Sequence, residues 1–178
     1  ATQNFVDLTT TQSVGGNKTF TGNVKVGSTL TVLANPSNTG TNNTYIGNEA
    51  GRFNTTGLQN TIVGDRNFSS NTTGNGNTAM GFLALNGNIV GGSNTGFGTN
   101  TLRFTTADNN TAVGRDALIN NSTGANNIAL GFNAGNQLTT GSNNIHIGHV
   151  GVAGESCIIR VGTAGNQTAT FLTGVING

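Results

Sequence analysis

The chain has 178 residues, of which 7% are charged and 29 are glycine. Typical soluble domains carry roughly 25% charged residues, and disordered chains are usually charge-rich and lack periodic apolar positions, so this composition excludes an ordinary charged surface and argues against disorder. The formal net charge is +1 with seven scattered basic residues, which argues against a nucleic-acid partner. No apolar run is long enough to span a bilayer, so we expect no direct membrane insertion.

Residues 1–37 come first and lack the repeat that follows. Short alternating segments at 24–26 and 30–32 are separated by glycine-containing turns, and Pro36 precedes the repeat. This pattern is typical of short strands joined by tight turns. We predict an N-terminal β connector or neck over 1–37.

Residues 38–162 repeat one five-residue phrase, typified by Asn110-Thr111-Ala112-Val113-Gly114. The glycines that close its copies are Gly47, Gly64, Gly81, Gly98, Gly114, Gly131, Gly148 and Gly162. The intervals between them are equal or differ by a single residue up to Gly148, and the last interval is shorter. A short period kept this strictly is typical of a solenoid in which each period forms one coil.

Within each phrase, alternation predicts a short strand with two different faces. The residue before each glycine is apolar, and we expect it to face the core. These residues are Ile46, Val63, Met80, Phe97, Val113, Leu130, Ile147 and Val161. The residue before it is often small, as at Ala112, and is expected on the opposite face, open to a close neighbour. Glycine then allows a turn.

The rest of each coil is expected to form a turn, a weaker strand and a second turn. Pairs such as Ala84-Leu85 and Ala117-Leu118 mark the weaker strand. The asparagine before each strand is expected to form a hydrogen-bonded ladder along the stack. After Gly162, residues 163–178 resume alternation, which predicts a closing strand or a strand-exchange segment.

A coil of about 17 residues encloses a thin core, so one chain buries little apolar surface for its length. We therefore expect two further copies of the chain to complete the structure. The predicted fold is all-β, a homotrimeric left-handed parallel β-roll or β-solenoid with short β segments at both ends. We expect about eight coils, each of about 14–17 residues.

The repeat resembles the head of the YadA-like trimeric autotransporter adhesins, on the phrase 110–114 and the following Ala117-Leu118 pair. That resemblance implies a trimeric left-handed β-roll displayed at a cell surface for attachment. The coils here are longer than is usual in that family. The flanks, at 7–20 and 24–32, are similar to phage-type trimeric tail fibres. An extracellular place on a bacterial cell surface or a phage virion follows from either resemblance.

The leading functional hypothesis is a non-enzymatic attachment fibre, an adhesin head or tail-fibre segment that binds a surface glycan or protein receptor. Its candidate ligand-binding residues lie in the turns after the strands: Asn48, Glu49, Asp65, Arg66, Phe82, Arg115, Asp116 and Phe132. Packing in the oligomer interface is the alternative role for the exposed phenylalanines. The rival functions are a structural rigid spacer and, from the threonine column, an ice-binding solenoid.

Catalysis is not expected, because carboxylates occur singly and form no acid/base pair. His146 and His149, with Glu155 nearby, are the only residues that suggest a metal. One histidine in a strand and another in its turn is more typical of a structural role. We therefore predict no catalytic residue, no metal and no cofactor.

Overall fold

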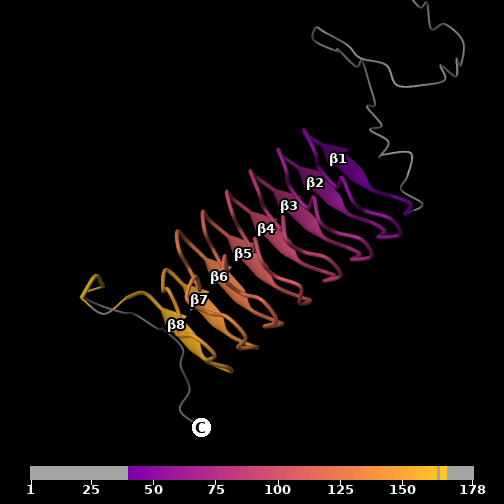
Figure 1. Ribbon diagram of the computed structural model, residues 1–178. Coiled ribbons are helices and arrows are strands. Elements are labelled where there is room, and N and C mark those ends of the chain that lie inside the picture. The colour runs from indigo at the N-terminus through magenta and orange to yellow at the C-terminus, as the bar shows by residue number, and fades with distance from the viewer. Residues whose placement is uncertain (1–39, 164, 168–178) are drawn as a thin grey trace, which may run out of the picture. The chain divides into compact units, whose positions relative to one another are not determined.

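A computed structural model describes residues 40–163 and 165–167, which form a solenoid with one strand in each coil (Figure 1). The strands are β1 Thr44–Ile46, β2 Thr61–Val63, β3 Thr78–Met80, β4 Thr95–Phe97, β5 Thr111–Val113, β6 Ile128–Leu130, β7 Ile145–Ile147 and β8 Ile159–Val161. The predicted segment 1–37 lies outside the described residues, and so does most of 163–178.

The eight strands form one parallel sheet in chain order, β1 to β8. Equivalent residues pair: Thr44 with Thr61 and Ile46 with Val63, and the same register continues to β7 and β8. Each coil therefore stacks directly on the one before it, which confirms the all-β solenoid. No helix occurs in the described part of the chain, so none there is long and apolar enough to cross a membrane.

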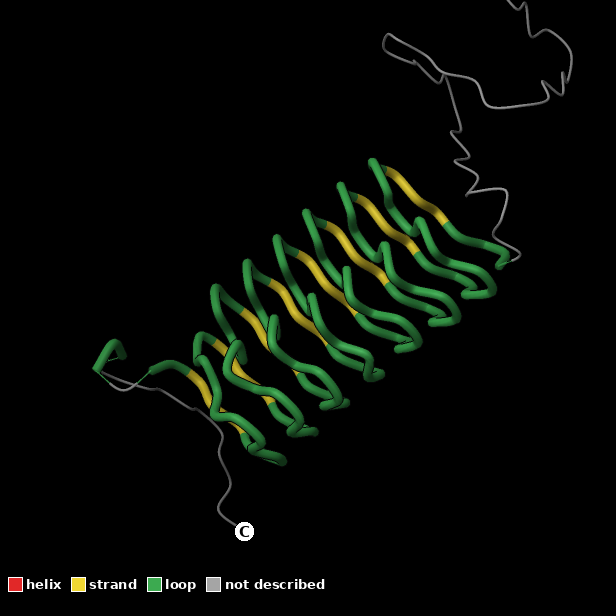
Figure 2. The backbone as a smooth tube through the Cα atoms, viewed as in Figure 1, coloured by secondary structure: helices red, strands yellow, loops and turns green. Residues whose placement is uncertain are grey.

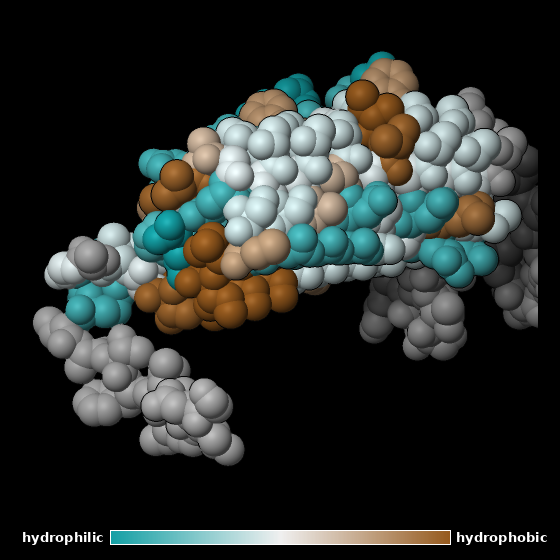
Figure 3. Space-filling view, turned by 90° about the horizontal axis from the view of Figure 1, so that it is seen from below, coloured by the Kyte–Doolittle hydropathy of each residue, from teal (hydrophilic) through white to brown (hydrophobic). Residues whose placement is uncertain are grey.

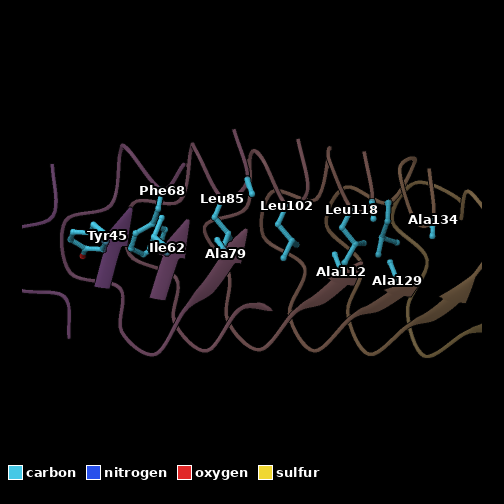
Figure 4. Packing of buried hydrophobic residues seen from close by; sticks show 13 residues of the cluster. Tyr45, Ile62, Phe68, Ala79, Leu85, Leu102, Ala112, Leu118, Ala129 and Ala134 are labelled. Carbon is cyan, nitrogen blue, oxygen red and sulfur yellow. The ribbon is translucent and has the colours of Figure 1, made fainter. Parts of the chain in front are cut away.

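The core is a narrow double row of side chains along the solenoid axis (Figure 4). One row is the central residue of each strand, and the other comes from the turn that follows. In the coils of β1 and of β3 to β5 their sizes complement each other. Tyr45 lies against Gly51, where an added Cβ would be 2.6 Å from the tyrosine ring, and in later coils Ala112 is paired with Leu118 (Figure 4).

The predicted assignment of the two strand faces is wrong within the chain. The small central residues point inward, whereas the apolar residues before the glycines point outward. Six of these are exposed, namely Ile46, Met80, Val113, Leu130, Ile147 and Val161, and Val63 and Phe97 are half-buried. The physical reason is the leucine row, which fills the thin interior and leaves room for only alanine or glycine at the centre of β3 to β5.

The predicted weaker strand is also absent from the described coils. Each coil has a single strand, and the remainder is turns (Figure 2). The pairs expected to form that strand are buried, but their leucines adopt left-handed backbone, with φ of 49° at Leu85 and 51° at Leu102. That conformation costs a non-glycine residue roughly 1–2 kcal/mol. Complete burial of the leucine side chains offsets this cost.

The glycines after the first six strands have φ between 118° and 140°. This range is closed to other residues, as the predicted turn requires. Gly64 shows a second constraint, because a Cβ there would collide with the carbonyl oxygen of Gly81 in the next coil. These glycines therefore set both the turn and the close stacking of coils.

The predicted asparagine ladder is confirmed. The Oδ1 of Asn60 accepts the backbone N–H of Asn77 at 2.9 Å, and the Oδ1 of Asn77 accepts that of Asn94 at 3.0 Å. Except at Asn110, whose Nδ2 donates to the carbonyl of Asp108, each Nδ2 donates to a carbonyl of the coil's last turn, as from Asn77 to Gly91 at 3.0 Å. These buried side chains satisfy backbone groups that the short strands leave unpaired.

A second buried asparagine column was not predicted. Asn71 Nδ2 donates to the carbonyl of Gly74, whose N–H donates back to Asn71 Oδ1. Asn88 closes the same turn with Gly91. The signal in the sequence is the recurring Asn-x-x-Gly spacing, which is typical of a turn closed by its own side chain.

Candidate functional site

The six-residue turns after the strands form one edge of the solenoid, which we call the Arg–Phe edge. It comprises residues 48–53, 65–70, 82–87, 99–104, 115–120 and 132–137. It holds every described arginine except Arg160, namely Arg52, Arg66, Arg103 and Arg115. It also holds the exposed phenylalanines of the described chain, Phe53, Phe82, Phe104 and Phe132.

At the N-terminal end of this edge, the charges neutralise one another. Glu49 Oε1 lies 2.6 Å from Arg52 Nη1, and Glu49 Oε2 lies 3.8 Å from Arg66 Nε. In the same two coils, Asn48 Nδ2 donates to Asp65 Oδ1 at 2.9 Å. These exposed contacts hold the turns in register and contribute little free energy each.

A second cluster joins three coils further along. Arg115 Nε lies 3.0 Å from Asp116 Oδ2, and the guanidinium carbon lies 4.6 Å from the ring centre of Phe132. Asn100 Nδ2 donates to Asp116 Oδ1 at 2.9 Å. Arg115 is thereby held between a carboxylate and an aromatic face, which limits its rotamers.

In the third kind of contact on this edge, an arginine guanidinium lies over the ring of the phenylalanine that follows it in the sequence. Arg52 lies 5.0 Å from the ring centre of Phe53, and Arg103 lies 5.0 Å from that of Phe104. The two pairs occupy the same place in coils that are three apart. Each phenylalanine is about half exposed, so these pairs present flat apolar surface beside a cation.

All eight predicted ligand-binding residues lie on the Arg–Phe edge, from Asn48 to Phe132. Seven of them form two clusters across neighbouring coils, and Phe82 belongs to neither cluster. Sequence reasoning missed Arg52, Phe53, Arg103 and Phe104. Their signal was the Arg-Phe dipeptide, which stands at the same distance after the strand-closing glycine in two coils.

The outward face of the sheet has a different chemistry, and we call it the sheet face. Its positions are the first and last residues of the eight strands, and none is charged. Threonine occupies the first position of β1 to β5, and isoleucine that of β6 to β8. The last three strands are therefore wholly aliphatic on this face. Figure 3 shows hydrophobic side chains gathered toward this C-terminal end.

The C-terminal end of the core carries a charged cluster. Buried His146 replaces alanine in the inward row, and its Nε2 lies 2.8 Å from Glu155 Oε1. Arg160 follows in that row and bonds Glu155 Oε2 at 2.8 Å. The hydrogen bond from Arg160 is the main cause that lowers the pKa of Glu155 to about 2. This cluster gives the last described coils a charged, hydrogen-bonded core in place of an apolar one.

His149 lies beside this cluster, with its ring centre 6.2 Å from that of His146. Burial lowers the pKa of His149, and the nearby charges of Arg160 and His146 act in the same direction. Within the described residues, no group of three or more His, Cys, Asp and Glu side chains is arranged to hold a metal ion.

Comparison of the chain with protein-family models, with curated proteins and with solved structures found no match. The structure itself defines the class of protein, a β-solenoid repeat protein. Its function is therefore inferred from its surfaces.

Proposed function

We propose that the chain is the head of a non-enzymatic trimeric fibre, displayed outside the cell on a bacterial surface or a phage virion, where it mediates attachment. The observation that carries this proposal is the sheet face, which runs the length of the solenoid without a charged side chain. In a single chain this face is exposed to solvent: the exposed fraction is 48% at Leu130, 70% at Ile159 and 63% at Val161.

An uncharged face that becomes wholly aliphatic over its last three strands is typical of an interaction surface. Burying a fully exposed aliphatic side chain gains about 1.5–3 kcal/mol. Half-exposed side chains gain about half of that, so the six aliphatic residues of β6 to β8 contribute on the order of 5 kcal/mol per chain. Self-association is the simplest source of cover, because a second copy presents the same uncharged face.

The size of the sheet face supports three chains. A standard interface uses about 20–30 residues a side, and the sheet face offers only two positions from each of the eight strands. A contact limited to this face therefore has fewer residues than a standard interface. Three solenoids around a common axis also bring the turns beside the sheet face into contact. The repeat's resemblance to trimeric adhesin heads supports the same number and a left-handed roll.

The Arg–Phe edge supports the attachment role. It places aromatic and cationic groups on the turns of several coils, and an assembly of three chains multiplies them. Repeated shallow sites bind weakly one at a time and strongly together. A surface glycan or a receptor protein that carries repeated epitopes suits such an edge.

The proposal is tested by coating beads with the native protein and measuring their retention on panels of surface glycans and matrix proteins. We expect retention that falls when Phe104 and Phe132 are both changed to serine, with the circular dichroism spectrum unchanged. No retention of the unaltered protein on any surface would favour the rigid spacer instead. A deletion of residues 65–98 removes two coils in register, and a spacer would tolerate it.

A further inference from the structure

Arg103 differs from the other arginines of the described chain because it forms no ion pair with the described residues. Arg52, Arg66, Arg115 and Arg160 each lie within 4.0 Å of a carboxylate oxygen. The guanidinium of Arg103 instead lies over the ring of Phe104, and its Nε is shielded from water without a hydrogen-bond partner. An arginine that is half-buried and not neutralised retains its full attraction for an anion.

The neighbouring coils leave Phe104 accessible. Gly87 occupies the equivalent position in the preceding coil, and its N–H donates to the carbonyl of Arg103 at 2.7 Å. A side chain cannot be added there without displacing the backbone, since a Cβ at Gly87 would lie 2.8 Å from that carbonyl oxygen. No side chain from this position covers the phenylalanine ring, which stays 49% exposed.

Two asparagines flank the pair. In the preceding coil, Asn86 Nδ2 donates to Ser69 Oγ at 2.7 Å, and in the following coil Asn120 Nδ2 donates to the carbonyl of Asn136 at 2.7 Å. Both Nδ2 groups are thus held by protein acceptors. The amide oxygens are left as acceptors for hydroxyl groups, of which sugars carry several.

The arginine fork matches the geometry of a carboxylate, with two parallel hydrogen bonds. The guanidinium covers one face of Phe104, so the other face is available to the apolar face of a ligand ring. Because the arginine and the free ring face lie on opposite sides of Phe104, the charged group and the stacked ring belong to neighbouring units, and with hydroxyls they describe an acidic oligosaccharide.

We propose that Arg103 and Phe104 form a subsite for two adjoining units of an acidic surface polysaccharide, with the carboxylate of one unit on Arg103 and the ring of the next against the free face of Phe104. This inference rests on the proposed attachment function and names the ligand class. Arg52 and Phe53 form a second copy of the pair three coils away, but Glu49 neutralises that arginine. The chain therefore supplies its own matched control.

The experiment is calorimetric titration of the native protein with oligogalacturonate and oligosialate, each against a neutral dextran oligomer of equal length. We expect both acidic oligomers to bind and dextran to bind at least tenfold more weakly. R103Q should weaken acidic binding at least tenfold, and F104S should weaken it several-fold. R52Q should change it less than twofold. R103K keeps the charge and loses the forked pair of donors, so its affinity for the acidic oligomers should lie between those of the unaltered protein and R103Q.

Three results would overturn this inference: no binding of either acidic oligomer, equal binding of dextran, or equal losses in R103Q and R52Q. Dextran sulfate that binds R103Q and unaltered protein alike would indicate attraction to bulk charge and would also count against the subsite. Retention on a collagen peptide that depends on Phe104 and not on Arg103 would assign the pair to a protein ligand. If R103Q still attaches to the beads' target surfaces, the sugar subsite alone is overturned. If the unaltered protein attaches to no surface, the proposed function is overturned.

Circular dichroism and solution mass identical to those of the unaltered protein are required of every variant, so that a loss of binding is not a loss of fold. If R103Q fails this requirement, F104S and R52Q still separate the two Arg–Phe pairs. In that case, equal binding by F104S and unaltered protein would overturn the subsite.

Discussion

Replacing Asn77 by alanine tests the asparagine ladder, which holds the coils in register. The change removes two donated hydrogen bonds, to Gly91 O and to Asn60 Oδ1, and one accepted bond from the N–H of Asn94. The Asn94 N–H then has no partner in a fully buried place, which costs about 1–3 kcal/mol. The two acceptors keep other donors, so each loses about 0.5–1 kcal/mol. We expect N77A to lower the free energy of unfolding by about 3 kcal/mol.

Thermal unfolding followed by circular dichroism measures this change, with N126A as the matched control. Asn126 is exposed and makes one long side-chain bond, 3.3 Å to Asn143 Oδ1. Because its backbone is left-handed, with a φ of 59° that alanine tolerates less well than asparagine, N126A should cost about 1 kcal/mol, well below the cost of N77A. If N77A and N126A unfold at the same temperature, the ladder does not contribute the stability assigned to it.

Three further changes probe the fold and its surfaces. Gly64→Ala should lower the free energy of unfolding by several kcal/mol, because the φ of 136° and the next coil both exclude a Cβ. Gly148→Ala, with open space around the added Cβ, should lower it by about 1 kcal/mol. Equal melting temperatures of the two variants would refute the stacking argument. Because the pKa of Glu155 falls from 4.5 to about 2 on folding, its stabilisation is complete above pH 4.5 and is lost as the pH drops toward 2. E155Q should remove that part of the acid dependence of the melting temperature, and an unchanged pH profile would contradict the role of the cluster. Leu130→Ser should weaken self-association, whereas Val90→Ser, similarly exposed but off the sheet face, should not. If sedimentation velocity shows that Leu130→Ser associates as the unaltered protein does, the sheet face is not the contact.

Repetition made the strands and their register predictable from the sequence. The phrase ending at Gly114 places β5 at Thr111–Val113, and every other copy marks a strand in the same way. Because the coils have nearly equal length, equivalent residues meet and the parallel pairing follows. The glycine turn and the asparagine ladder were predictable for the same reason, since each requires one residue type at one place in every coil.

The inward face could not be predicted from alternation. Alternation separates two faces and gives no sign of which one is enclosed. The deciding partner of Ala112 is Leu118, which reaches it from a turn that propensity rules assign to a strand. Left-handed backbone at a leucine is unfavourable locally and is imposed by packing.

The sequence predicted where the candidate site lies, but only some of the residues that form it. Position in the repeat was enough to bring Asn48 and Phe132 to one edge. Arg103 differs from Arg52 in having no carboxylate partner, and the sequence carries that signal: Glu49 stands three residues before Arg52, whereas Asn100 holds the equivalent place before Arg103. The shielding of the Arg103 Nε depends on packing and could not be predicted.

Self-association through the sheet face is the central claim, and the mass of the native protein in solution tests it most directly. One chain has a mass of 18.0 kDa. Sedimentation equilibrium at micromolar concentration should find a single species with three times the mass of one chain. A single species of 18.0 kDa under those conditions would contradict the account.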